Sequence, residues 1–161
     1  MPDEIGSTLR FPLTEVKEVG ELAVRAEVPS DAFADALSEG ALIGPVTLAG
    51  VIRRADEEAH FEGVAAGRWR FECTRCLAPV DGEWREKLDV LAPIDGGPLD
   101  LTEDVRQSIG LAQPMKIFCK PDCQGLCSVC RQNRNLVDCG HAQGGAESST
   151  RPRLTPRPDK G

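Results

Sequence analysis

The sequence has no tyrosine, few other aromatic residues and no long apolar run. It contains five Phe and two Trp among 161 residues, whereas Gly and Pro are frequent, at 16 and 12. With hydrophobic residues at 40%, we expect a thin core with many turns. No stretch approaches the roughly 18–20 consecutive apolar residues of a membrane helix, and the acidic N-terminus has no apolar segment behind it. We therefore expect a cytoplasmic protein with no membrane contact.

The motifs of common enzyme classes are also missing. The sequence contains no nucleophile elbow, phosphate loop or dinucleotide fingerprint, and the Gly-Gly pair at 96–97 lacks the surrounding pattern. Its carboxylates are scattered, which is typical of solvated surface charge. His60, one of two histidines, is expected to be a solvated strand residue. These absences predict a protein that is not an enzyme.

The charge is negative overall and unevenly distributed. The formal net charge is −7, but residues 151–161 carry four basic residues against Asp159, a balance of +3, so residues 1–150 carry −10. Such an acidic body argues against a general RNA binder, which needs clustered Lys and Arg. Arg68 and Arg70 are the local exception, because the period of two places both on the polar face of one predicted strand.

Apolar and polar residues alternate with a period of two in four segments, which predicts strands with one buried face. These segments are 22–28, 46–52, 69–73 and 84–90, and weaker ones are 9–13 and 60–65. Asp81-Gly82 is typical of a hairpin turn at the start of the last strand. Short connections of this kind predict an antiparallel sheet over residues 9–92.

Two short helices are also expected. Ser30 is placed as the N-cap of a helix over 31–37, and Asp100 with Glu103 resembles a capping box for a helix over 100–110. The predicted fold class is therefore α+β, mainly an antiparallel β-sheet with one or two short helices, in one domain over 1–142. Residues 143–161 are rich in Gly, Ser, Pro and Arg, and we expect them to form a disordered basic tail.

Seven cysteines are the most informative residues. Their number is odd, so they cannot all pair in disulfides, and clustered cysteines in a reducing compartment are more often metal ligands. Two Cys-x2-Cys pairs have the spacing that lets both sulfurs of a tight loop face one ion. With the residues that accompany them, the candidate ligands are Cys73, Cys76, Cys119, Cys123, Cys127, Cys130, Cys139 and His141.

Eight ligands predict two tetrahedral sites, and the spacing favours one partition. Residues 127–141 form a compact unit, Cys-x2-Cys-x8-Cys-x-His, which leaves Cys119 and Cys123 to join Cys73 and Cys76 across a loop of about 43 residues. The alternative places Cys73, Cys76, Cys127 and Cys130 on one ion. A third reading is that Cys73 only continues an apolar strip.

The chemistry of the ligands indicates the metal. Thiolates with an imidazole favour zinc, although an iron–sulfur cluster is the alternative. Because sulfur predominates and no general base accompanies it, we expect about two structural zinc ions.

The cysteine segments closely resemble the YceD family of bacteria and plastids. The residues that carry the resemblance are Phe71-Glu-Cys-Thr-Arg-Cys-Leu-Ala-Pro-Val80, Cys119-Lys-Pro-Asp-Cys-Gln-Gly-Leu-Cys-Ser-Val-Cys130 and Asn133-Arg-Asn135. The resemblance covers roughly residues 10–141 and is weak before residue 45. It implies a non-enzymatic role in 23S rRNA accumulation and in assembly of the large ribosomal subunit.

This chain departs from the family pattern at the second group of cysteines. The family commonly reads Cys-Pro-x-Cys-Gly and ends in Cys-x-Cys, where this chain has Ser128, Arg131 and Cys139-Gly-His141. The acidic body is better suited to a basic ribosomal protein or a pre-ribosomal particle than to naked RNA. A contact with 23S rRNA would use Arg68, Arg70 or the basic tail. The alternative function is a redox- or zinc-responsive regulator, and the oligomeric state is left open.

Overall fold

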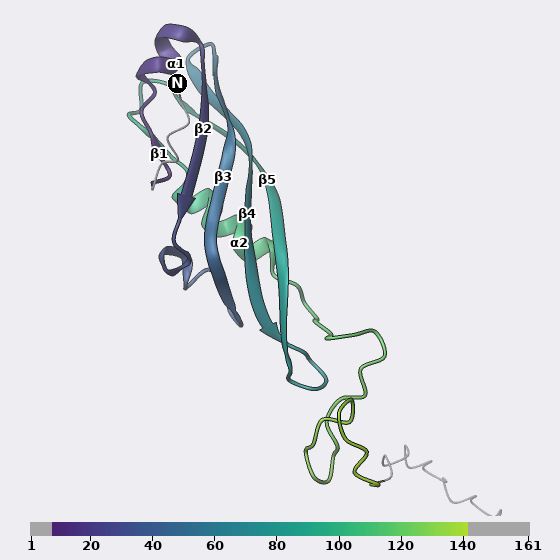
Figure 1. The fold of residues 1–161 in the computed structure, drawn as a ribbon. Coiled ribbons are helices and arrows are strands. Elements are labelled where there is room, and N and C mark those ends of the chain that lie inside the picture. Colours follow the sequence, from purple (N-terminus) through teal and green to yellow (C-terminus); the bar gives the residue numbers. More distant parts are fainter. Residues whose placement is uncertain (1–7, 142–161) are drawn as a thin grey trace, which may run out of the picture.

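The computed structural model describes residues 8–141 and is built around a four-stranded antiparallel sheet (Figure 1). The strands lie in the order β2-β3-β4-β5 and span β2 (Glu21–Val28), β3 (Ala41–Ala55), β4 (Glu58–Glu72) and β5 (Pro79–Pro93). Each strand pairs with the next one along the chain. The predicted α+β class with a mainly antiparallel sheet is thus confirmed.

Short elements cover the sheet and its upper end. They are β1 (Arg10–Phe11), α1 (Thr14–Val19), the 3-10 helix η1 (Ser30–Phe33), β6 (Leu99–Asp100) and α2 (Thr102–Ala112), with β1 and β6 forming a second small sheet. Figure 1 shows α2 behind the long sheet, α1 at one end, and the irregular segment 113–141 leaving the opposite end. The cysteine-rich segment is therefore remote from α1 and β1.

The core lies between one face of the sheet and the helices. Alternate residues of the strands point into it, and α2 contributes Val105 and Ile109. Its largest fully buried side chains are Phe33, Leu48, Ile52, Phe61, Leu101 and Ile109. The opposite face of the sheet carries most of the charged strand residues. Within residues 8–141, no helix is long and apolar enough to cross a membrane.

The predicted hairpin turn at Asp81-Gly82 is wrong. Both residues lie inside β5, where Asp81 pairs with Arg70 and Gly82 with Trp69. Gly82 is required by packing, because a Cβ there would lie 2.4 Å from the Trp69 ring. The chain reverses instead through Cys73–Cys76, between β4 and β5.

Other boundaries also differ from the predicted ones. The segments 60–65 and 69–73 belong to one continuous strand, β4, and the helix expected over 31–37 is only the 3-10 turn η1, with no side-chain cap at its start. The second helix runs over Thr102–Ala112, where the Asp100 carboxylate accepts a hydrogen bond from the Thr102 N–H (3.0 Å). Helix α1 was not predicted. The expected disordered tail, 143–161, lies outside the described residues.

Candidate metal centres

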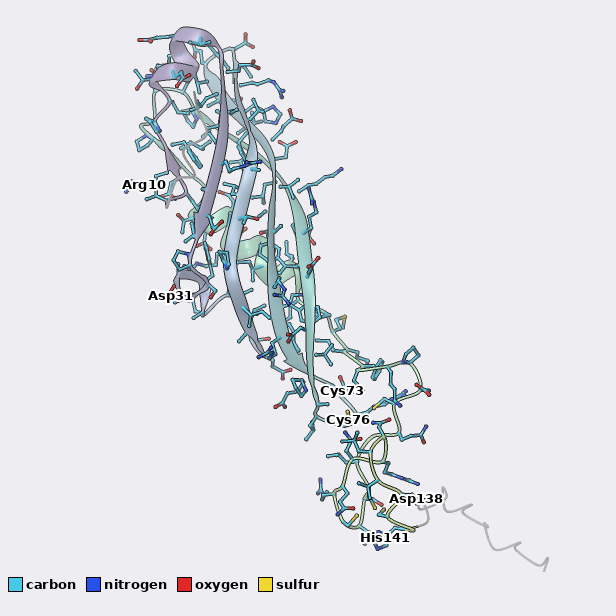
Figure 2. All side chains as sticks on the ribbon, in the orientation of Figure 1. Arg10, Asp31, Cys73, Cys76, Asp138 and His141 are labelled. Carbon is cyan, nitrogen blue, oxygen red and sulfur yellow. The ribbon has the colours of Figure 1, made fainter. Side chains whose placement is uncertain are left out.

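Four cysteines meet at the lower end of the sheet and form what we call the first cysteine group. Cys73 and Cys76 come from the loop between β4 and β5, and Cys119 and Cys123 from the segment after α2. Their sulfur atoms all lie within 4.8 Å of one another. Cys73, Cys76 and Cys123 are buried, and Cys119 is exposed. Figure 2 shows Cys73 and Cys76 where the sheet joins the cysteine-rich segment.

Backbone hydrogen bonds give the Cys73 loop its shape. The Leu77 N–H donates to the Cys73 carbonyl (2.9 Å), and the Cys73 N–H donates to the Ala78 carbonyl (2.8 Å). Leu77 takes the left-handed conformation, with φ of 61°. This turn directs the sulfurs of Cys73 and Cys76 to the same side of the loop, which is what two ligands of one ion require.

The second cysteine group comprises Cys127, Cys130, Cys139 and His141 at the far end of the segment. Their ligand atoms also lie within 4.8 Å of one another, and the His141 Nδ1 faces the Cys127 sulfur at 3.6 Å. Cys127 is buried, Cys130 and Cys139 are half-buried, and His141 is exposed. Figure 2 labels His141 at this end of the molecule.

The Cys127 loop repeats the Cys73 loop in its backbone geometry. The Arg131 N–H donates to the Cys127 carbonyl (2.9 Å), and the Cys127 N–H donates to the Gln132 carbonyl (2.8 Å). Arg131 is left-handed, with φ of 62°, at the position that corresponds to Leu77. Two equivalent loops therefore supply one half of each cysteine group.

The distances within both groups match a tetrahedral zinc ion. Zinc with bonds of about 2.3 Å to sulfur and about 2.0 Å to nitrogen holds two sulfurs about 3.8 Å apart, and a sulfur and a nitrogen about 3.5 Å apart. The structure has 3.7 Å between the sulfurs of Cys73 and Cys123, 3.5 Å between those of Cys76 and Cys119, and 3.6 Å between Cys127 and His141. All seven cysteines are free thiols, so no disulfide competes.

Hydrogen bonds in each group favour a thiolate. Burial opposes the charged form of Cys73, but backbone N–H groups of Cys76, Cys119 and Arg75 lower its pKa to about 6. For Cys127, the backbone N–H groups of Cys130 and Val129 lower the pKa to about 6 against the effect of burial. The thiolate is the form that binds a metal. Each loop thus holds one sulfur ready for a cation.

Contacts around Arg75 and Thr74 fix the Cys73 loop against the later segment. The Thr74 N–H donates to the Ile117 carbonyl (2.8 Å), and the Arg75 guanidinium donates to the Cys123 carbonyl (3.3 Å). The same guanidinium lies over the Phe118 ring, 4.5 Å from its centroid. The two halves of the first group are therefore positioned by contacts beyond the sulfurs.

The structure brings the eight candidate ligands together in the partition that the spacing favours. The interleaved alternative, with Cys73, Cys76, Cys127 and Cys130 on one ion, does not occur within residues 8–141. Cys73 is fully buried, so it also packs, as its strand pattern indicates. Residues that the ligand spacing does not reveal are Thr74, Arg75 and Asn135, because their roles depend on contacts between distant segments.

The other singled-out residues lie on the polar face of the sheet. Arg68 and Arg70 are both exposed there, and Arg70 makes a bidentate ion pair with Asp81 (2.6 and 2.8 Å). His60 is half-buried and contacts the Asp89 carboxylate (2.8 Å). Glu62 lies beside this pair but accepts from Arg53 (2.9 Å), so its carboxylate is already neutralised by a cation.

Relatives from mycobacteria resemble part of this chain. An uncharacterized protein of Mycobacterium leprae is 25% identical over 114 residues, which cover 60% of this chain and 52% of that protein. Uncharacterized proteins of Mycobacterium bovis and Mycobacterium tuberculosis are 28% identical over 96 residues, which cover 49% of this chain and 46% of each relative. The chain spans about half the length of these relatives. No solved structure matches.

A family model matches the C-terminal part of the chain. The matched residues are 83–156, which include most of β5, all of α2 and six of the eight candidate ligands, and the family is described as "Large ribosomal RNA subunit accumulation protein YceD". The cysteine spacing in Cys119–Cys130 had indicated the same family. The match of residues 83–156 supports the resemblance to the YceD family that the cysteine segments indicate.

Proposed function

We propose that the protein is a non-enzymatic ribosome biogenesis factor that supports 23S rRNA accumulation and large-subunit assembly in the cytoplasm, and that two structural zinc ions stabilise it. The observation that carries this proposal is the match of residues 83–156 to a family described by large ribosomal RNA subunit accumulation. The two four-ligand groups support the zinc component. No catalytic role is proposed for any residue.

The ligand sets support a structural role for zinc. Each group offers four protein ligands, which complete a tetrahedron and leave no position for a substrate or a water. Zinc bound to the first group would link the turn after β4 to the segment after α2. In the second group, residues 127–141 alone would hold the ion. When bound, zinc supplies a crosslink in place of the disulfides that the thiols do not form.

The charge distribution supports a protein partner in the pre-ribosomal particle. Residues 1–150 carry −10, which attracts a basic ribosomal protein and repels RNA phosphates. Arg70 is neutralised by Asp81, so Arg68 is the better of the two arginines for a direct 23S rRNA contact. The basic tail is the other proposed contact with rRNA.

One observation favours the alternative function, a redox- or zinc-responsive regulator. The second cysteine group is open to solvent at His141 and partly at Cys130 and Cys139, as a sensor requires. Mild peroxide treatment of the zinc-loaded chain separates the two functions. A structural protein keeps both ions, whereas a regulator releases the ion of the second group and regains it on reduction.

The proposed function is tested in the native host. Deletion of the gene should lower the ratio of 23S to 16S rRNA and cause large-subunit precursors to accumulate, and the tagged full chain should co-purify with those precursors. The chain with Arg68→Ala serves as a matched variant for the rRNA contact, because it changes charge without touching the core. An unchanged rRNA ratio in the deletion strain would contradict the proposal.

A further inference from the structure

One side chain connects the two cysteine groups. Asn135 belongs to the loop between Cys130 and Cys139, two ligands of the second group, yet its side-chain N–H donates to the sulfur of Cys123 in the first group (Nδ2 to Sγ, 3.3 Å). Among the described residues outside the two groups, Asn135 is the one whose side chain donates a hydrogen bond to a ligand sulfur. It therefore touches one group while its loop is held by the other.

The Asn135 side chain is held in this orientation by its neighbours. Its Oδ1 accepts from the Gln124 backbone N–H (2.9 Å), and its Nδ2 also donates to the Asn133 Oδ1 (2.8 Å). The Asn135 backbone N–H donates to the same Asn133 oxygen (2.9 Å). These bonds fix the side-chain torsions, so the amide group faces Cys123 without further loss of conformational freedom.

The backbone carries the connection across the segment. Leu126 and Asn133 form an isolated antiparallel bridge, and the Arg134 N–H donates to the Gly125 carbonyl (2.9 Å). Residues 133–135 therefore lie directly on the stretch that joins Cys123 to Cys127. A change in the path of the loop between Cys130 and Cys139 would move Asn135 away from Cys123.

We propose that Asn135 is a positioning residue that couples the two metal centres, so that an ion in the second cysteine group strengthens binding of an ion in the first. This inference rests on the zinc sites of the proposed function. The second ion holds both ends of the loop, and the loop then presents the Asn135 amide to the Cys123 thiolate. Because binding free energies are linked, the first ion strengthens the second by the same factor.

Charge explains why a donor is needed at the first group. Four thiolates around Zn²⁺ leave that centre with two excess negative charges, whereas three thiolates and an imidazole leave one. A hydrogen bond from a neutral amide stabilises a thiolate, and removal of such an outer contact typically weakens metal affinity about 10–100-fold. The donor thus lies at the more negative of the two groups.

Isosteric variants of the full chain distinguish this role from loop shaping. Asn135→Asp keeps the oxygen that accepts from Gln124 but places a second carboxylate oxygen against the Cys123 sulfur. Asn133→Asp is the matched control, because it adds the same charge two residues away and keeps the oxygen that accepts from Asn135. Co²⁺ can be titrated against a competing chelator, and the four-sulfur and three-sulfur centres are separated by their absorption bands.

We expect Asn135→Asp to weaken Co²⁺ binding at the first group by about tenfold or more, Asn135→Ala by less, and Asn133→Asp by under threefold. Circular dichroism verifies that the sheet remains folded. First-group affinities that stay within twofold of the wild-type value in Asn135→Asp would overturn the proposal.

A double-mutant cycle measures the coupling itself. Cys139→Ser removes the second ion and should weaken first-group binding severalfold in the wild-type chain but not in the Asn135→Ala chain. An equal effect in both chains, or none in either, would overturn the coupling through Asn135. A wild-type chain that binds no metal would instead overturn the zinc component of the proposed function, which is a different result from two ions bound independently.

Discussion

The two cysteine loops are alike in backbone and unlike in surroundings. Both reverse direction through a left-handed residue, Leu77 in one and Arg131 in the other, and both make the same pair of backbone hydrogen bonds. The Cys73 loop, however, joins two long strands and meets ligands 43 to 50 residues away, whereas the Cys127 loop finds its remaining ligands within 14 residues. Local sequence determines the turn, and tertiary context determines what the turn stabilises.

Loop entropy alone does not account for the different stabilisation that we expect from the two cysteine groups. Closing 43 residues rather than the 9 between Cys130 and Cys139 changes the loop-closure free energy by only about 1.4 kcal/mol. Burial separates the groups further, since three of the four ligands in the first group are buried, whereas Cys127 alone is buried in the second. The first group should therefore stabilise the whole fold directly, and the second mainly its own segment, with a smaller effect on the fold through the coupling at Asn135.

The largest expected effect is the difference in stability between Cys73→Ser and Cys127→Ser, which change the first cysteine of each loop. Cys73→Ser leaves a buried hydroxyl and removes the link between β4 and the later segment, so we expect it to lower the free energy of unfolding by about 3 kcal/mol or more. Cys127→Ser should lose one zinc and change the free energy of unfolding of the sheet by less than about 1 kcal/mol. Urea unfolding followed by circular dichroism, with elemental analysis, measures both.

The control for this pair is a small substitution at the surface of the sheet that changes no cysteine, such as Thr47→Ser. Equal losses of stability in Cys73→Ser and Cys127→Ser would mean that both groups support the sheet. The distinction between a global and a local crosslink would then be wrong.

Metal removal should give the next largest effect and should occur in two stages. A chelator reaches the second group first, because Cys130 and Cys139 are half-buried and His141 is exposed. We expect one equivalent of zinc to leave with little change in circular dichroism or melting temperature, and the other to leave together with a marked fall in melting temperature. If the first ion to leave lowered the melting temperature and the second did not, the assignment of the two stages to the two groups would be reversed.

The sequence predicted the sheet from the alternation along each strand, and the grouping of the candidate ligands from their distances along the chain. Alternation along 22–28 identified β2, and the cysteine spacing separated two groups of four. The pattern failed in β4, where Gly63 and Gly67 interrupt the apolar face. A Cβ at Gly63 would lie 2.4 Å from the Phe61 ring, and one at Gly67 would lie 2.7 Å from the Trp84 Nε1. These glycines make room for aromatic rings and do not end the strand.

Two further features were beyond the sequence pattern. Helix α1 has six residues and buries only Val16, so it shows no apolar period. Asn135 lies in the motif that carries the family resemblance, but its contact with Cys123 spans 12 residues and two loops. Spacing indicates which residues can bind an ion, whereas the contacts that orient those residues become visible only in the folded chain.

The smallest expected effect tests the left-handed residues that the two loops share. A residue with a Cβ pays about 1–2 kcal/mol in this conformation, and glycine recovers most of that but loses about 0.5–1 kcal/mol through the flexibility of the unfolded chain. Arg131→Gly should therefore tighten zinc at the second group about two- to fivefold and leave the unfolding of the sheet unchanged. Leu77→Gly should instead raise the melting temperature, because its loop belongs to the sheet. Chelator competition and thermal melts on the zinc-loaded chain measure the two effects. If Arg131→Gly moved the melting temperature as much as Leu77→Gly, the second loop would be part of the cooperative fold, and its difference from the first would be one of exposure alone.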